Sequence, residues 1–375
     1  MPDPEDLFAT LRRFPDVEAP NLFAVDAADR LILDEAANDL AAVPDGTVVV
    51  IGDHYGALTL GAATTHGLSG IRVHQDGLPG EKALAANAER SGLTDRFTSL
   101  ALEPELVEGA RVVLMQLPRS LAELGEQAEI IARHAHPDVV VFAGGRIKHM
   151  TTAMNEVFGT TFSDVRAGLG RQKSRVLTVR GPQGDGEQSF PVRVTLEHPP
   201  IDVVAYGAVF GGPKLDIGTR FLLDFLSQVD KAARTAVDLG CGTGILAVEL
   251  ARANPNLTVV ATDQSAAAVA SAAATAVANG VGDRVHALRD DAMSTIDDAS
   301  HDVIVCNPPF HIGAAVHTGA ARKMFAAAGR VLRPGGEMWT VYNTHLGYCG
   351  MLTELVGETE VVGRNAKFTV TVSRR

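Results

Sequence analysis

The residues best suited to chemistry lie in the stretch DVIVCNPPFHIG, Asp302–Gly313, of the 375-residue chain. An apolar run typical of a buried strand ends there at Asn307, which two prolines and Phe310 follow. The prolines stiffen the turn and remove two N–H groups. The Asn307 side-chain oxygen and the Pro308 carbonyl can then accept both hydrogens of one –NH₂ group, while Phe310 can stack on a flat base. Methylation of an exocyclic amine needs this arrangement, because it turns the nitrogen lone pair toward a methyl donor mainly by positioning.

A glycine-rich turn upstream of this motif predicts a cofactor site. The segment AVDLGCGTGILAV has the order apolar strand, glycine turn and helix start, and its glycines are Gly240, Gly242 and Gly244. Glycines let the backbone approach a ligand closely. The dinucleotide fingerprint fails because Ile245 stands where its last glycine is needed. Asp238 at the strand end would repel a pyrophosphate but suits a cationic amino group. We therefore expect S-adenosylmethionine, which has such a group and no phosphate.

Acidic residues end the next two predicted strands. TVVATD ends at Asp263, and RVHALRDDAM carries Asp290 and Asp291. Open α/β sheets bind ligands at the carboxyl ends of their strands. We expect Asp263 to accept the ribose hydroxyls and Asp291, in preference to Asp290, to accept the adenine amine. Each acid alone could be a helix cap or a turn residue, but their placement at successive strand ends favours a site.

The elements that must position these residues occur twice in the chain. Strand-like runs alternate with Ala/Leu-rich helical runs, which is typical of an α/β protein with a mostly parallel sheet. VVVIGDHYGALTL repeats the outline of the glycine turn, SGLTDRFTSL repeats NGVGDRVHAL, and VVLMQLPR repeats VIVCNPPF, in the same order. We predict two tandem Rossmann-like domains, residues 1–183 and 193–375, joined by a Gly/Pro/Gln-rich linker at 184–192.

The first copy lacks the groups that a ligand would need. Val50 stands where the second copy has Asp238, and His54 stands where it has Gly242. Gln-Leu-Pro-Arg at 116–119 replaces Asn-Pro-Pro-Phe. The apolar positions that form a core are kept. We expect the first copy to be a scaffold or a substrate-docking module.

The composition restricts the partners. The net charge is −12, whereas a protein that coats nucleic acid should be basic. Contact with RNA would therefore rely on local patches such as GRIKH at 145–149 and GRQKSR at 170–175, for which a solvated surface is the alternative interpretation. The three cysteines are far apart, which argues against a disulfide framework or a zinc cluster. With no membrane-spanning apolar run and no signal pattern, we expect a cytoplasmic protein without membrane or metal.

Together, DLGCGTGILAV and NPPFH resemble class I methyltransferases that act on amino groups. FGGPKLDIGTRFLL, LRPGGEMWTVYNTHLGY, the closing VVGRNAKFTVTVSRR and, in the first half, GGRIKHMTTAMNEVFG are similar to the bacterial ribosomal RNA guanine-N2 methyltransferases. The resemblance covers nearly the whole chain. It implies two tandem class I methyltransferase domains, the first degenerate. It also implies methyl transfer from S-adenosylmethionine to N2 of a guanosine in ribosomal RNA or in a ribosomal assembly intermediate.

The resemblance also assigns residues. It implies a target-base pocket of Asn307, Pro308 and Phe310. For the cofactor pocket it implies Asp238, Gly240, Gly242, Asp263 and Asp291, with Asp216 and Thr219 at the entrance; we add Gly244 and Asn307. His311 follows the motif as in the family, and it could contact the base or RNA or be structural.

Other functions stay open at this stage. Adenine-N6 methylation of RNA or DNA and glutamine methylation of a protein use the same turn, because each substrate presents a planar –NH₂ group. A non-enzymatic ribosome-associated RNA-binding module is a further alternative, against which the intact Asp238, glycines and Asn307 argue. A nicotinamide-dependent enzyme is least favoured because of Ile245.

Overall fold

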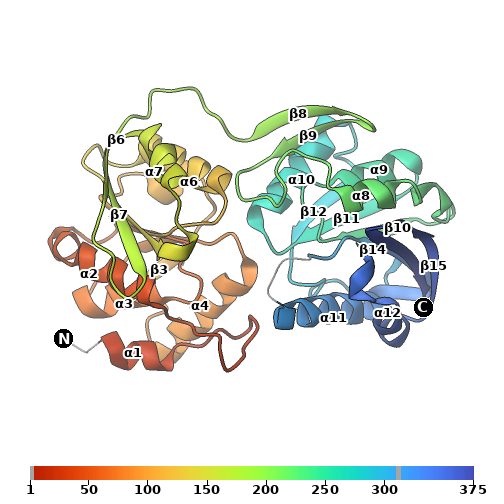
Figure 1. The fold of residues 1–375 in the computed structure, drawn as a ribbon, viewed down its shortest axis with the longest axis horizontal. Coiled ribbons are helices and arrows are strands. Elements are labelled where there is room, and N and C mark those ends of the chain that lie inside the picture. The colour runs from red at the N-terminus through yellow and green to blue at the C-terminus, as the bar shows by residue number, and fades with distance from the viewer. Residues whose placement is uncertain (1–3, 310–313) are drawn as a thin grey trace. The chain divides into compact units, whose positions relative to one another are not determined.

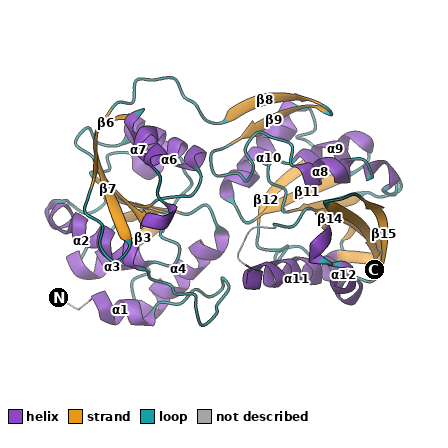
Figure 2. Ribbon diagram, in the orientation of Figure 1, coloured by secondary structure: helices purple, strands orange, loops and turns teal. Residues whose placement is uncertain are grey.

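The structure is a computed structural model that describes residues 4–309 and 314–375. For residues 314–318 it describes the backbone alone. The chain divides into two compact units, Met1–Phe190 and Pro191–Arg375. In each unit helices cover both faces of a sheet (Figures 1 and 2).

The N-terminal unit contains a seven-stranded sheet in the order β3-β2-β1-β4-β5-β7-β6. Its strands are β1 (Val48–Ile51), β2 (Ile71–His74), β3 (Phe97–Ser99), β4 (Val112–Gln116), β5 (Val140–Arg146), β6 (Phe162–Ala167) and β7 (Ser174–Pro182). Its helices are α1 (Pro4–Thr10), α2 (Ala27–Ala42), α3 (Ala57–His66), α4 (Leu78–Ser91), α5 (Pro104–Val107), α6 (Leu121–His134), the 3₁₀ turn η1 (Ile147–His149) and α7 (Thr152–Gly159). Strand β7 runs antiparallel to β5 and β6, and the other pairs are parallel.

The C-terminal unit repeats this plan in the order β12-β11-β10-β13-β14-β16-β15. Its sheet strands are β10 (Thr235–Leu239), β11 (Thr258–Asp263), β12 (Val285–Arg289), β13 (His301–Cys306), β14 (Leu332–Asn343), β15 (Glu358–Arg364) and β16 (Phe368–Arg374). Its helices are α8 (Ile217–Leu223), η2 (Leu226–Gln228), α9 (Ile245–Ala253), α10 (Ala266–Ala278), α11 (Ala314–Val331), η3 (Thr344–Leu346) and α12 (Cys349–Leu355). A separate hairpin, β8 (Val192–Glu197) and β9 (Pro200–Ala205), packs on α10, where Thr275 Oγ1 accepts from Val204 N at 3.0 Å.

The shared strand order confirms the predicted α/β fold with two tandem Rossmann-like units. The registers also correspond, because Val50 pairs with Val73 and Leu114 as Asp238 pairs with Ala261 and Val305. Within the predicted linker, the chain packs on the N-terminal unit: Ser189 N donates to both carboxylate oxygens of Glu129, at 2.9 and 3.1 Å.

Successive strand residues are buried on opposite faces of each sheet, which fixes the strands between two helical layers. In β10, Ala236 joins one apolar cluster and Val237 joins the cluster on the other face. Burying a Val or Leu side chain fully contributes about 1.5–3 kcal/mol. A strand that is apolar on both faces, such as Val303–Cys306, is therefore held firmly, and the residue that follows it is placed reproducibly at the sheet edge.

Within the described part of the chain, no helix is long and apolar enough to span a bilayer. Cys241 and Cys306 are buried free thiols, and burial raises the pKa of both. They are therefore poor nucleophiles. Both act as small buried residues at the ends of strands.

Candidate active site

The glycine turn after β10 has a backbone conformation that residues with side chains rarely adopt. Gly240, Gly242 and Gly244 all have left-handed φ values of +77°, +52° and +78°. At Gly244 a Cβ atom would lie 2.8 Å from the Ala272 Cα atom of α10, so only glycine lets the two elements approach this closely. Gly240 N donates to the Thr262 carbonyl at 2.9 Å, which ties the turn to the end of β11. The turn therefore presents bare backbone at the sheet edge.

Asp238 is buried beneath this turn with a spare acceptor. Its Oδ2 atom accepts from Ala247 N at 3.0 Å, whereas Oδ1 is buried and no donor of the described residues reaches it. Burial raises the pKa of Asp238 to about 7; the hydrogen bond from Ala247 opposes the rise, and the charge of Asp263 adds to it. A buried carboxylate of this kind is costly unless a partner is supplied. A cationic ligand group would supply it.

Asp263 connects the glycine turn to the next helix. Its Oδ2 atom accepts from Gly242 N at 3.1 Å, and its Oδ1 atom accepts from Ser265 N at 3.0 Å. Ser265 in turn is the N-cap of α10. A carboxylate can accept several hydrogen bonds at once, and ligand hydroxyls are donors of the kind it accepts.

The two acids after β12 have different surroundings. Asp290 is buried and accepts from Ser294 Oγ, Thr295 N and Thr295 Oγ1 at 2.5, 2.8 and 2.8 Å. Burial alone would raise the pKa of Asp290, but these bonds outweigh it and the pKa is lowered. Asp291 instead pairs through Oδ2 with Lys323 Nζ at 2.5 Å. Asp290 therefore holds the loop, and of the two acids Asp291 has the less occupied carboxylate.

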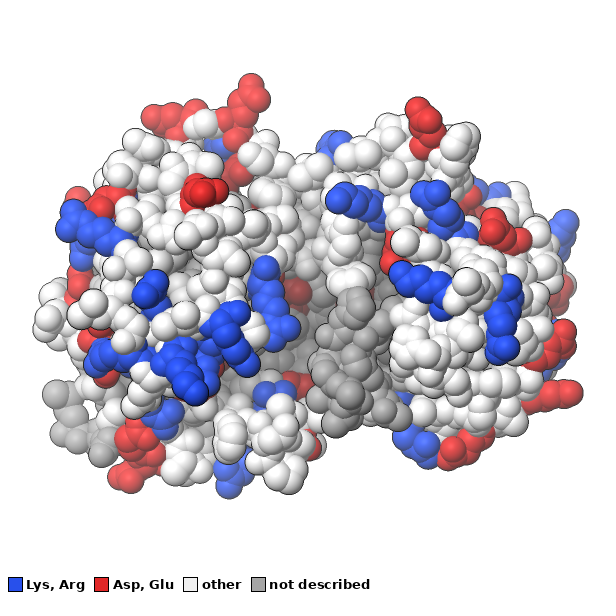
Figure 3. Space-filling model, in the orientation of Figure 1, with Lys and Arg blue, Asp and Glu red and all other residues white. Residues whose placement is uncertain are grey.

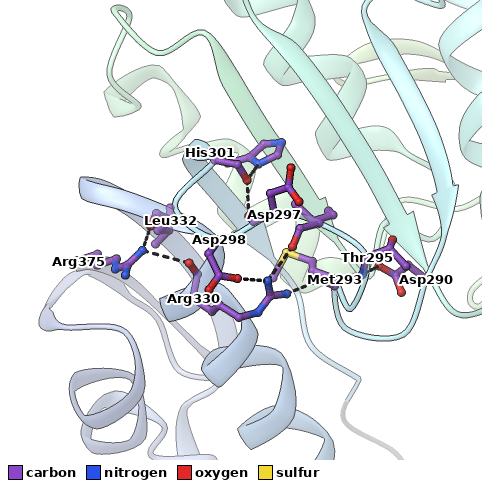
Figure 4. Close-up of polar contacts among 11 residues, drawn as sticks. Asp290, Met293, Thr295, Asp297, Asp298, His301, Arg330, Leu332 and Arg375 are labelled. Carbon is purple, nitrogen blue, oxygen red and sulfur yellow. Dashed lines mark hydrogen bonds and ion pairs between the residues drawn. The ribbon is translucent and has the colours of Figure 1, made fainter.

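The loop that carries Asp291 is fastened to α11 by Arg330 (Figure 4). The Arg330 guanidinium donates to the carbonyl of Met293 and to Asp298 Oδ1, both at 2.6 Å. Figure 4 also shows Arg375 donating to the backbone around Arg330. These contacts fix the loop between β12 and β13.

Asn307 stands at the end of β13 with its amide group oriented. The Nδ2 atom donates to Asp216 Oδ2 at 2.9 Å and to Thr219 Oγ1 at 3.0 Å. Asp216 is the N-cap of α8, and its Oδ2 atom also accepts from Gly218 N at 2.7 Å. Because both donors of the amide point to α8, Oδ1 points away; it is buried, and among residues 4–309 and 314–375 it has no hydrogen-bond partner. The site thus contains an oriented acceptor ready for a donor.

The other residues predicted for the base pocket come directly after Asn307 in the sequence. Pro308 is buried and Pro309 is exposed. The assignments of Phe310 and His311 lie outside the described residues.

The N-terminal unit has the same turn, and an amide stands at the same strand end. Gly52, His54 and Gly56 have φ values of +74°, +58° and +100°, so His54 keeps the left-handed backbone that Gly242 has. At the position of Asn307, the Gln116 amide donates to Asp29 on α2. In both units, therefore, a residue at the start of a helix holds the amide at this strand end: Asp29 of α2 holds Gln116, and Asp216 at the start of α8 holds Asn307.

A carboxylate at the first turn was not anticipated. Asp53, at the position of Cys241, accepts from Leu58 N at 2.8 Å and Thr59 N at 2.9 Å, one with each oxygen. The position of Asp238 is still taken by Val50, and Asp53 lies three residues further along the chain. Unlike Asp238, however, Asp53 has a donor on both oxygens.

Three contacts at the site were also missed from the sequence. Lys323 pairs with Asp291 from 32 residues away, and Asp216 and Thr219 hold Asn307 from about 90 residues away. Spacing carries no signal for such contacts. Gly218 also packs closely against the site. A Cβ atom at this position would lie 3.4 Å from Asn307 Nδ2 and 3.3 Å from the Phe368 ring. In the described part of the chain, no three His, Cys, Asp or Glu side chains gather as a metal site would need.

Comparisons with known proteins match the two halves of the chain to two different family models. Residues 200–372 match the methyltransferase small domain family, and residues 3–183 match the RLMG N-terminal domain. The chain is 36% identical to the ribosomal RNA large subunit methyltransferase G of Streptomyces avermitilis, over 96% of this chain and 95% of that protein. It is also 36% identical to the protein of that name from Pseudomonas putida, over 97% of both. A solved T. thermophilus 16S rRNA N2 methyltransferase, RsmC, in complex with AdoMet and guanosine, has the same fold, with a TM-score of 0.73, 21% identity and coverage of 96% and 97%.

Proposed function

Because the chain belongs to the family of ribosomal RNA large subunit methyltransferase G, we propose that it transfers a methyl group from S-adenosylmethionine to the exocyclic N2 amine of a guanosine in large-subunit ribosomal RNA. The observation that carries the chemistry is the Asn307 Oδ1 atom, which is buried and has no hydrogen-bond partner among the described residues, while Asp216 and Thr219 orient its amide.

The residues around the glycine turn fit the cofactor. S-adenosylmethionine, when bound, supplies an electrophilic methyl group on a sulfonium centre. Asp238 Oδ1 is the acceptor for the ammonium group of its amino-acid part, since this oxygen is buried beside the turn and no donor in the described part of the chain reaches it. Gly240, Gly242 and Gly244 leave room for the ligand, Asp263 accepts from ribose hydroxyls, and the Asp291 carboxylate accepts from the adenine amine.

Asn307 positions the target amine. Its Oδ1 atom accepts one N–H of the guanine amine, and the Pro308 carbonyl accepts the other. With both hydrogens held, the nitrogen lone pair turns out of the ring plane toward the methyl donor. The barrier falls mainly because the reacting atoms are oriented before reaction, so no strong base is required. Phe310 is assigned to stack on the base.

The substrate base must be accessible. N2 of a paired guanine lies in the duplex, so the nucleotide has to be unpaired or flipped out of its stack. We expect protein-free ribosomal RNA or an early assembly intermediate to meet this requirement, in the cytoplasm where ribosomes are made.

The proposal is tested by methyl transfer to protein-free ribosomal RNA in vitro. Asn307→Ala should abolish transfer while cofactor binding, measured by calorimetry, persists. Gln116→Ala, which removes the corresponding amide of the N-terminal unit, is the matched control and should retain transfer once corrected for folded protein. Full turnover by the Asn307 variant would overturn the mechanism. Absence of cofactor binding by the wild-type protein would favour an RNA-binding module without activity.

A further inference from the structure

The hairpin of β8 and β9 in the C-terminal unit has an open edge. These two strands form a sheet of their own, in which β8 pairs with β9 alone. Figure 1 draws β8 above β9 at the top of this unit, and Figure 3 shows both basic and acidic side chains on the face of the unit that it draws. An unpaired strand edge presents a row of N–H and C=O groups to which another strand can bind.

Helix α10 closes the other edge of the hairpin. The backbone amides of Asp202 and Val204 on β9 donate to side chains of this helix, to Asn279 Oδ1 at 3.1 Å and to Thr275 Oγ1 at 3.0 Å. Asn279 Nδ2 in turn donates to the Asp202 carbonyl at 2.7 Å. Residues four apart lie on one face of a helix, so both side chains reach the same strand. A further strand can therefore join the hairpin at β8 and not at β9.

The bonds to α10 also determine which backbone groups of β8 point outward. In an antiparallel pair, two residues directly opposite each other either exchange both hydrogen bonds or both direct these groups away. Thr195 lies opposite Asp202, and Arg193 lies opposite Val204. Because the amides of these two β9 residues point to α10, the N–H and C=O groups of Thr195 and Arg193 point away from β9. The alternation along a strand extends this to Glu197.

The sequence of β8 is complementary to itself about Thr195. Arg193 and Glu197 lie two residues to either side of Thr195, and Val194 and Leu196 lie one residue to either side. In an antiparallel pair of two β8 strands with Thr195 opposite Thr195, each Arg193 faces Glu197 of the second copy. Each Val194 then faces Leu196 of the second copy. Opposite charges and apolar pairs directly across two strands both stabilise the pairing.

The side chains of β8 are available for this pairing. Arg193 and Glu197 are exposed, and neither makes an ion pair or a side-chain hydrogen bond within the part of the chain that the structure describes. Val194 is 38% exposed, although its neighbour Val203 on β9 is fully buried. Leu196 is only partly buried against the core. A second β8 strand would therefore cover exposed apolar surface and supply the charge that each end of the strand lacks.

We propose that β8 pairs antiparallel with β8 of a second copy of this chain and joins the two hairpins into one four-stranded sheet, β9-β8-β8-β9. The inference is independent of the proposed function. Stable protein interfaces bury about 1,200 Å² or more, and a single pair of short strands buries less. The dimer should therefore be weak and reversible. A strand of a different protein is the competing occupant.

The test uses charge reversal in the full-length protein, with the dimer Kd measured by sedimentation velocity from micromolar to several hundred micromolar protein. Arg193→Glu alone and Glu197→Arg alone each place like charges opposite each other at both ends of the strand pair. Each variant should raise the dimer Kd at least about tenfold. Lys231→Glu, which makes the same change in charge as Arg193→Glu at an exposed position outside β8, is the matched control and should keep the wild-type Kd.

An equal mixture of the two variants should form a heterodimer with a Kd within about threefold of the wild-type value. In the heterodimer, the acid introduced in one chain faces the base introduced in the other, and Glu197 of the first chain faces Arg193 of the second. This recovery also shows that both variants are folded. A wild-type protein that stays monomeric throughout the concentration range would overturn the inference. So would a dimer that both single variants keep unchanged, or a mixture that dimerises no better than either variant alone.

Discussion

Binding of the cofactor should depend on pH through Asp238. The pKa of this buried carboxylate is about 7 against an ordinary value of 3.8. At 1.36 kcal/mol per unit, keeping it ionised in the free protein costs on the order of 4 kcal/mol. A cationic ligand group needs the ionised form. Below pH 7 the proton must first be removed, so the cofactor Kd should rise about tenfold for each pH unit below 7 and level off above it.

The same shift fixes the sign of the stability effect. Because the folded-state pKa is raised, the contribution of Asp238 to stability is fully present below about pH 4 and is lost as pH rises through 7. The free protein should therefore lose stability from this group as pH rises from about 4 to 7, with no further loss above, and the cofactor should restore it.

Calorimetry at pH 6, 7 and 8 in buffers of different ionisation enthalpy measures both the Kd and the proton released. We expect release of about half a proton at pH 7 in the wild-type protein. Asp238→Asn should bind the cofactor more weakly, without pH dependence, and should lack the loss of stability between about pH 4 and 7. Asp290→Asn is the matched control, because that carboxylate is buried but fully hydrogen-bonded; it should keep the pH dependence of binding. A wild-type Kd that is constant from pH 6 to 8 would refute the reasoning.

Two further predictions concern positioning and packing. Thr219→Val removes one of the acceptors that orient Asn307 and should lower kcat about tenfold, worth about 1.4 kcal/mol, with cofactor Kd unchanged and with Thr219→Ser close to wild type; a raised Kd with normal kcat would place Thr219 at the cofactor instead. Gly244→Ala combines left-handed strain with a Cβ 2.8 Å from Ala272 and should destabilise the protein by about 3 kcal/mol or more in urea unfolding, whereas Gly280→Ala, which has a similar φ but open space around it, should cost about 1 kcal/mol; equal losses would contradict the packing argument.

The sequence could predict the parts of the site that follow from topology. Asp238, the glycines, Asp263 and Asn307 each follow an apolar strand, and parallel strands bring their carboxyl ends to one edge. The duplication predicted two units of the same Rossmann-like fold, because both copies keep the apolar positions that form the core.

Other features depend on three-dimensional packing and could not be predicted. The bonds from Asn307 to α8 join segments about 90 residues apart, and the pair Asp291–Lys323 joins a loop to a helix. The binding of Asp53 to the amides of Leu58 and Thr59 likewise depends on how the turn folds back on the start of α3. The two basic stretches were visible in the sequence, but which of their cations are unpaired depends on α2, whose acids neutralise Arg171 and Arg180.

The most direct test of the account is nucleoside mass spectrometry of large-subunit ribosomal RNA from a strain that lacks this protein. We predict that N2-methylguanosine falls by one residue per ribosome, and that the wild-type gene restores it whereas the Asn307→Ala variant, at equal protein level, does not. Unchanged N2-methylguanosine with loss of N6-methyladenosine, or full restoration by the Asn307 variant, would contradict the central claim that this amide holds the guanine amine for methylation.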